Sequence, residues 1–223
     1  MSSLTIVGAG GHGREVFDTL SAINAASPGT WRVLGFVDDG DVAVDRLARL
    51  GSRLLGGTDH LATEPGWYTL GIGTSGTRRA LAERLATSGC RAATVMHPGA
   101  HIGVDVELGE GVIVFDRSTI TTNVRIGRHT HLNVGCAVQH DTVVGDFVQF
   151  SPGVLVNGDC RIEDDVFLGS GAIVTRGCTV GRGARVGAGA VVLDDVAAGS
   201  TVVGIPARPT AGFEPRSPRA EAR

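Results

Sequence analysis

Aromatic side chains are scarce in this chain of 223 residues, since only 4% of them are Phe, Trp or Tyr. A core built on packed rings is therefore disfavoured, although 42% of the residues are hydrophobic. The chain also contains 34 glycines. This composition favours a narrow core that is filled by small aliphatic side chains, with glycine where the backbone turns.

Lysine is absent, and the formal net charge is −3, which argues against a nucleic-acid partner. No apolar run is long enough to cross a bilayer, and the N-terminus lacks a basic segment followed by an apolar one. We therefore expect a cytoplasmic protein without a membrane partner. Three of the four cysteines, Cys136, Cys160 and Cys178, are expected to be buried small hydrophobic residues rather than disulfide partners.

A period of six residues runs from Ala100 to Asp195 without an insertion. In all sixteen hexads the third residue is apolar, and the first is small, hydroxylic or aliphatic. Such a period is typical of a solenoid, in which each repeat buries its inner side only against its neighbours. Three hexads make one triangular coil, so we expect an all-β prism. The apolar third residues are Ile102, Leu108, Val114, Ile120, Ile126, Leu132, Val138, Val144, Phe150, Val156, Ile162, Leu168, Val174, Val180, Val186 and Val192.

Residues 18 positions apart lie on one face of such a prism, one coil higher each time. One outward column is almost wholly apolar, whereas the other two are mixed. Apolar outward rows indicate an interface, and a three-sided prism with one such face closes most simply as a three-fold ring. We therefore predict a homotrimer that associates through the column Thr119, Ala137, Leu155, Ile173 and Val191.

The N-terminal part reads as a small parallel α/β domain. A strand at 4–7 leads into the glycines of a GxGxxG spacing and a helix at 12–25, and a second strand at 32–37 ends in Asp38 and Asp39. This arrangement forms an anion site at the helix N-terminus, with acids placed for a ribose or base. Further elements are expected at 68–72, 78–88 and 91–96. The domain is half the size of a complete dinucleotide fold, so it suits a nucleotide sugar better than NAD.

We divide the chain into a Rossmann-like nucleotide-sugar-binding domain at 1–97, the prism at 98–208 and a flexible tail at 209–223. The segment Val202–Arg208 is expected to close the open end of the prism, where an edge would otherwise invite pairing. The tail is expected to be disordered from about Ala211 because it contains little apolar surface.

His140 lies at a corner beside the apolar column and is followed by Asp141. Such a histidine can take up a proton near neutral pH, and the adjacent carboxylate can orient its ring. A metal held by His129, His131 and His140 is disfavoured, because these residues occupy different hexad positions. No metal is expected, and His129 is expected to be a solvated surface residue.

Several segments together resemble the left-handed β-helix sugar O- and N-acyltransferases, a group that includes sialic acid O-acetyltransferases and UDP-4-amino-sugar N-acetyltransferases. These segments lie at both ends of the chain as well as in the hexads, so the resemblance covers residues 4 to about 208. They are Val7-Gly8-Ala9-Gly10-Gly11-His12-Gly13, Phe36-Val37-Asp38-Asp39, Leu132-Asn133-Val134-Gly135, Val138-Gln139-His140-Asp141, Gly145-Asp146 and Val203-Gly204-Ile205-Pro206-Ala207-Arg208.

The resemblance implies roles for particular residues. His140 would be the general base, supported by Asp141, and acetyl-CoA would be the co-substrate. The substrate-binding positions would be Gly10, Gly11, His12, Asp38, Asp39, Gly73 and Asn133, and the CoA contacts Gln149, Ser170 and Ala188. Gly158, in the coil after His140, is our hypothesis for an oxyanion donor next to the cofactor. The chain departs from the family pattern at Gln149, where a histidine is expected.

The resemblance therefore implies acetyl transfer from acetyl-CoA to an amine or hydroxyl of a sugar, with a nucleotide-linked 4-amino sugar as the favoured acceptor. Two alternatives remain within this scheme: O-acetylation of a free sugar such as sialic acid, and a non-catalytic assembly protein that binds a sugar nucleotide. A nicotinamide-dependent oxidoreductase is a third alternative, suggested by the glycine-rich turn alone.

Overall fold

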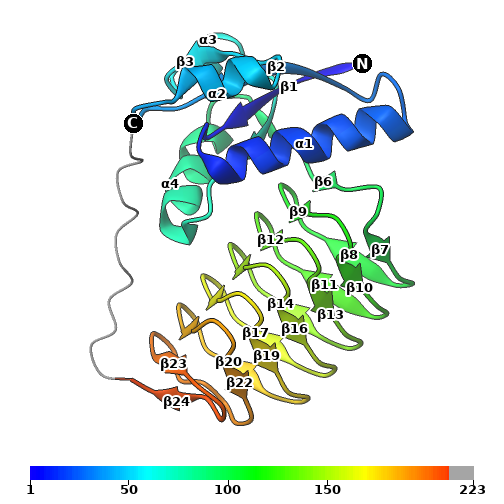
Figure 1. The fold of residues 1–223 in the computed structure, drawn as a ribbon, viewed down its shortest axis with the longest axis vertical. Helices are drawn as coiled ribbons and strands as arrows, with labels where there is room; N and C mark the ends of the chain where they lie inside the picture. Colours follow the sequence, from blue (N-terminus) through cyan, green and yellow to red (C-terminus); the bar gives the residue numbers. More distant parts are fainter. Residues whose placement is uncertain (211–223) are drawn as a thin grey trace.

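The computed structural model describes residues 1–210, which form an N-terminal α/β unit over one side of a three-sided prism (Figure 1). The disordered tail that the sequence predicts lies, from residue 211 onward, outside the described residues. No helix in the described part is long and apolar enough to cross a membrane.

The N-terminal unit contains one sheet of five parallel strands in the order β3-β2-β1-β4-β5. Apolar side chains from both sides of β1 are fully buried, which places this strand at the centre of the sheet. The strands are β1 (Ser2–Val7), β2 (Trp31–Val37), β3 (Leu54–Gly56), β4 (Trp67–Leu70) and β5 (Arg91–Ala92).

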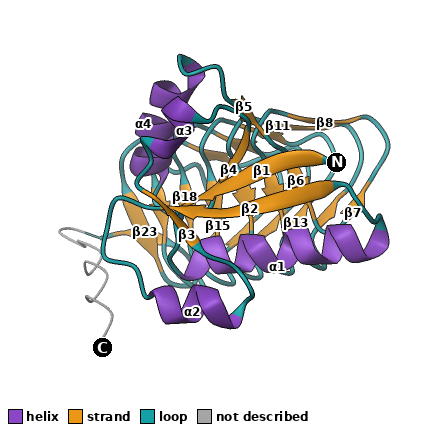
Figure 2. Ribbon diagram, turned by 90° about the horizontal axis from the view of Figure 1, so that it is seen from above, coloured by secondary structure: helices purple, strands orange, loops and turns teal. Residues whose placement is uncertain are grey.

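Helices flank this sheet, with α1 and α2 on one side in the view of Figure 2 and α3 and α4 on the other. The helices are α1 (Gly11–Ala26), α2 (Val44–Arg49), α3 (His60–Thr63) and α4 (Ser75–Ala86). The predictions of α1, α4 and the strands around them are confirmed. The elements α2, β3 and α3 were not predicted, since each spans at most six residues and shows no clear period.

The prediction of one continuous strand at 91–96 is wrong. The segment is divided into β5, which belongs to the N-terminal sheet, and β6 (Val95–Met96), which pairs with β9 of the prism. The chain therefore passes from one unit to the other between Ala92 and Val95. Our domain division at residues 97 and 98 remains a prediction.

The prism has three parallel sheets, which we name by their surfaces. The apolar face contains β7 (His101–Ile102), β10 (Thr119–Ile120), β13 (Ala137–Val138), β16 (Leu155–Val156), β19 (Ile173–Val174) and β22 (Val191–Val192). The charged face contains β8 (Val106–Leu108), β11 (Val124–Ile126), β14 (Val143–Val144), β17 (Arg161–Ile162) and β20 (Thr179–Val180). The covered face contains β6, β9 (Ile113–Val114), β12 (His131–Leu132), β15 (Gln149–Phe150), β18 (Phe167–Leu168), β21 (Arg185–Val186), β23 (Thr201–Val203) and the antiparallel β24 (Arg208–Pro209).

The hexad prediction is confirmed by the strand register, in which partners on adjacent coils are 18 residues apart. Both inward positions form one continuous core of small aliphatic side chains. Cys136, Cys160 and Cys178 are buried and free, as predicted. The closing segment pairs through β23 and β24 at the last coil.

The covered face takes its name from the N-terminal unit, which packs on it. Ile113 and Phe115 of the prism share one apolar cluster with Leu4 and Val16, and Phe147 belongs to a second one with Leu70. The outward column of this face is therefore buried near the N-terminal unit, whereas Leu155 on the apolar face is exposed.

Candidate active site

His140 and Asp141 form a hydrogen-bonded pair at the corner between the apolar and the charged face. The His140 Nδ1 and Asp141 Oδ2 atoms are 2.8 Å apart, and Asn123, one coil below, donates to Asp141 Oδ1 over 3.2 Å. Asp141 has φ 62°, a left-handed conformation that Asp tolerates better than most residues. Hydrogen bonds from His140 and Asn123 lower the pKa of Asp141 below its ordinary value.

This pair has the geometry of a general base. Because Asp141 is ionised at neutral pH, Nδ1 of His140 must be the donor, which leaves Nε2 of the neutral ring with a free lone pair. The His140 side chain is 45% exposed in the single chain, so a substrate can reach it. Asn123 was not identified from the sequence; its position 18 residues before Asp141 was the available signal.

Gly158 lies against the His140 ring. A Cβ atom at Gly158 would come within 2.9 Å of three ring atoms of His140, so any larger residue there would displace the imidazole. The Gly158 N–H donates to no acceptor among residues 1–210. The structure therefore brings together His140, Asp141 and Gly158 from two adjacent coils.

The predicted nucleotide-binding residues gather at the carboxyl edge of the N-terminal sheet. Gly10 is the N-cap of α1, and both Gly10 and Gly73 face open space. Asp38 accepts hydrogen bonds from the backbone N–H groups of Ala9 (2.7 Å) and Gly40 (2.8 Å), so its carboxylate shapes the turn after β1.

Asp39 is bonded to Thr58, which follows β3 at the same edge of the sheet. Its two carboxylate oxygens accept from the Thr58 N–H (2.7 Å) and hydroxyl (2.6 Å). These two bonds, together with the charge of Arg84, lower the pKa of Asp39. A carboxylate has about four acceptor sites, so these bonds leave capacity for a ligand.

The remaining predicted contacts lie on the prism, along the edge of the apolar face that is opposite to the edge carrying His140. Asn133, Ser170 and Ala188 occupy the corner between the covered and the apolar face, since they follow β12, β18 and β21. His140 and Gly158 occupy the other edge of the apolar face. One chain therefore carries the two sets of predicted residues on two separate edges.

Two family models match this chain, one in each of the two units. Residues 3–85 match the PglD N-terminal domain, and residues 159–194 match the bacterial transferase hexapeptide repeats. The chain is 34% identical over 160 residues to the GDP-perosamine N-acetyltransferase of Escherichia coli O157:H7, an alignment that covers 68% of each protein. The chain belongs to the hexapeptide-repeat sugar acyltransferase family.

Solved structures of this family share the whole fold of the acyltransferase described here. The acetyltransferase domain of PglB from Neisseria gonorrhoeae FA1090 is 30% identical, with a TM-score of 0.83 over 94% of this chain and 100% of that one. PerB from Caulobacter crescentus, in complex with CoA and GDP-perosamine, is 28% identical, with a TM-score of 0.84 over 95% of this chain and 98% of that one. The prism is therefore the left-handed β-helix that the sequence predicts.

Gln149, at the departure from the family pattern, is buried beneath the N-terminal unit of the acyltransferase. Its Oε1 accepts from Arg78 over 2.8 Å, and its Nε2 donates to the Phe150 carbonyl over 3.1 Å. The residue is only 5% exposed in the single chain. The CoA contact that the resemblance implies at Gln149 stays a prediction.

His12 meets a second histidine at the same interface. Its Nε2 lies 3.0 Å from Nδ1 of His131, and its Nδ1 lies 3.3 Å from the Glu15 carboxylate. His131 is fully buried, and burial holds its pKa well below the ordinary value, so it remains neutral. The burial of His131 under α1 was not predicted from the sequence.

His129 is likewise buried, which corrects the expectation that it is solvated. Its ring stacks between Tyr68 and Phe147, with centroid distances of 6.3 and 5.2 Å. No group of three or more potential metal-binding side chains occurs within residues 1–210. His129 and His131 belong to the covered side of the prism, and His140 to the opposite corner.

Proposed function

We propose that this acyltransferase moves the acetyl group of acetyl-CoA to the amine of a nucleotide-linked 4-amino sugar. The His140–Asp141 pair carries the proposal, because it supplies a base at an accessible corner of the prism. The relatives support the substrates: the acetyltransferase domain of PglB was solved with acetyl coenzyme A, and PerB with CoA and GDP-perosamine. The cytoplasmic location expected from the sequence is part of the same proposal.

The geometry of the corner supports the following steps. His140 Nε2 takes a proton from the amine while the nitrogen attacks the thioester carbonyl and forms the C–N bond. The Gly158 N–H, which has no partner among the described residues, would donate to the oxyanion of the tetrahedral intermediate. The C–S bond then breaks, and the proton on His140 passes to the leaving thiolate. Asp141 keeps the ring oriented throughout.

We further propose that the complete site forms between copies of the chain in a homotrimer. The outward residues of the apolar face would be buried between three prisms arranged around a three-fold axis. Its two edges would then adjoin, so that His140 of one copy faces Asn133 and Ser170 of the next. The nucleotide-binding edge of that neighbour and the acetyl-CoA would meet at this seam. This explains why a single chain separates the two sets of residues.

Thiol release from acetyl-CoA tests the reaction. The acceptor panel contains GDP- and UDP-linked 4-amino sugars, the corresponding 4-hydroxy sugars and free sialic acid. We expect turnover with an amino-sugar nucleotide, and a fall in kcat of about 10²- to 10⁴-fold in His140→Ala, as removal of a general base predicts. His140→Asn keeps a polar, uncharged side chain and removes the titrating ring, and we expect it to bind CoA while failing to turn over.

The panel also separates the alternatives. Turnover with sialic acid alone would show that the acceptor group is a hydroxyl and not an amine. Binding of a nucleotide sugar without release of thiol from any acceptor would favour the assembly protein. Full activity of His140→Ala would show that His140 is not the base.

A further inference from the structure

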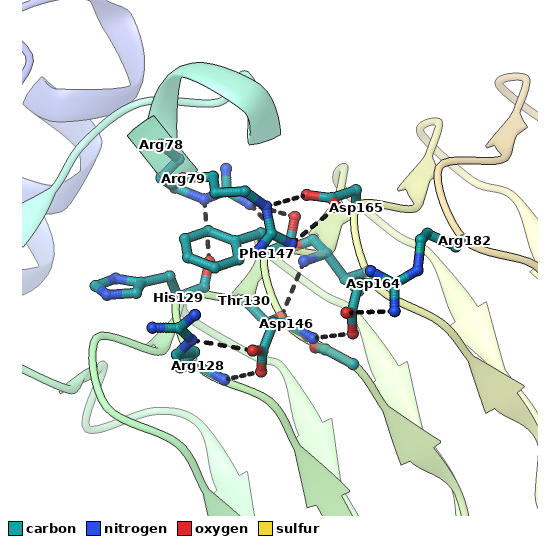
Figure 3. Close-up of polar contacts among 12 residues, drawn as sticks. Arg78, Arg79, Arg128, His129, Thr130, Asp146, Phe147, Asp164, Asp165 and Arg182 are labelled. Atoms are coloured by element: carbon teal, nitrogen blue, oxygen red, sulfur yellow. Dashed lines mark hydrogen bonds and ion pairs between the residues drawn. The ribbon is translucent and has the colours of Figure 1, made fainter. Parts of the chain in front are cut away.

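Arg78 is a fully buried arginine between the N-terminal unit and the prism, and it hydrogen-bonds both. From the start of α4 it donates to the Ile72 carbonyl (2.9 Å) and the Gly73 carbonyl (3.1 Å) of the turn after β4. On the prism it reaches the backbone carbonyls of His129, Phe147 and Val148 and the side chain of Gln149. Figure 3 shows Arg78 and Arg79 extending from α4 towards these coils.

We propose that Arg78 is a positioning residue for the acceptor, because it fixes the nucleotide-binding edge of the N-terminal sheet relative to the prism. The inference rests on the proposed function, in which Gly73 lies beside the nucleotide. Arg78 acts through Gly73 and the turn after β1, and does not itself touch the substrate.

All the donor groups of Arg78 are used. A guanidinium has five N–H groups, and here they serve six acceptors. All six acceptors are neutral oxygens, and the nearby Asp165 is bonded instead to Arg79. Lysine has three donors on one atom and cannot reproduce this fork, so Arg78→Lys preserves the charge and removes the geometry.

The turn held by Arg78 is packed against the glycine-rich turn after β1. A Cβ atom at Gly8 would lie 2.7 Å from Ile72 Cγ1 and 2.9 Å from the Gly71 carbonyl oxygen. The two turns therefore have to move together. Any shift of Ile72 and Gly73 relative to the prism would be transmitted to Gly10 and His12, where the phosphates are expected to bind.

The burial of Arg78 also indicates a role beyond filling space. Burial lowers its pKa to about 9, so the guanidinium remains charged at neutral pH in a place without a hydrogen-bonded carboxylate. An apolar side chain would fill the same interface at less cost in desolvation. Only arginine provides several N–H donors that point in fixed directions towards both units.

Arg79 provides a matched control. It comes from the same helix and crosses the same interface, where it forms an ion pair of 2.8 Å with Asp165 and lies 4.2 Å above the Phe147 ring. Arg79 makes no hydrogen bond to the turn after β4 among the described residues. A general loosening of the interface would follow from either substitution, whereas displacement of the nucleotide site would follow only from that of Arg78.

The test compares Arg78→Lys with Arg79→Gln in steady-state kinetics. For Arg78→Lys we expect the KM for the amino-sugar nucleotide to rise by about tenfold or more, which corresponds to a hydrogen bond lost in the acceptor site. The KM for acetyl-CoA should stay within about twofold, because the CoA contacts proposed on the prism do not involve this turn. Arg79→Gln should leave both constants within about twofold. Equal changes in both KM values, or an unchanged acceptor KM, would overturn the proposal.

Two further measurements keep the result interpretable. If Arg78→Lys does not fold, Gln149→Met removes one acceptor of Arg78, and it should shift the acceptor KM in the same direction by a smaller factor. Calorimetric titration with GDP and UDP measures the nucleotide site without turnover. Weaker binding of the nucleotide by Arg78→Lys would support the positioning role even if no acceptor sugar reacts. Failure of wild type to bind either nucleotide would overturn it.

Discussion

At the scale of single residues, His129 couples folding to pH. Burial lowers its pKa from the ordinary value of 6.5 to about 4. As the pH falls below about 6.5, the unfolded chain takes up a proton at this position before the folded chain does. The free energy of unfolding should therefore fall between about pH 6.5 and 4, by about 3 kcal/mol in total for this residue. His131, with its pKa shifted the same way, adds to this loss.

The variant His129→Phe isolates the contribution of His129. Phe147, at the same corner one coil later, has φ 57° against φ 53° for His129, so an aromatic residue is accommodated in this conformation. Phenylalanine keeps the stack and removes the titrating group. In urea unfolding at pH 7 and pH 5, the variant should lose less stability than wild type between the two pH values. An equal loss in both proteins would show that His129 does not carry this pH dependence.

At the scale of elements, the corner that carries the proposed base depends on Gly158 in the coil above it. In Gly158→Ala the new methyl group would meet the His140 ring, so we expect kcat to fall by about 10²-fold, as small misplacements of catalytic groups do. Gly158 has no left-handed φ, so the backbone itself accepts alanine. Gly66→Ala serves as the control, because its Cβ would meet only the Ser3 carbonyl oxygen at 3.8 Å. Wild-type kcat in Gly158→Ala would contradict this account of the corner.

An element could be predicted from the sequence where the residues that determine it lie within the element itself. The prism strands follow from a six-residue period in which the inward residues of each hexad can be identified from that hexad alone. The order and register of these strands were therefore predictable. The membership of β6 was not, because its partner β9 lies 18 residues further along the chain and pairing is not visible in six residues of sequence. The hydrogen bond between Gln149 and Arg78 could not be predicted either, because no sequence pattern indicates which face of the prism α4 covers.

At the scale of the whole molecule, the proposed trimer predicts that the apolar face is essential and the charged face is not. Leu155 and Val143 occupy equivalent outward positions on these two faces, and they are 39% and 41% exposed. We expect the isolated prism to tolerate an arginine at either position, because both side chains are exposed to solvent. In the trimer, three copies of Leu155→Arg would bury unpaired charge around the axis.

We therefore expect Leu155→Arg to sediment as a monomer and Val143→Arg to sediment as wild type does. The monomer should keep the strand spectrum of the prism in circular dichroism. Its acetyl transfer should fall by at least about 10²-fold, because His140 and the nucleotide-binding edge of the neighbouring copy no longer adjoin. Monomeric Leu155→Arg with full activity would show that one chain suffices for catalysis, and the site would then have to be completed by residues of the same chain.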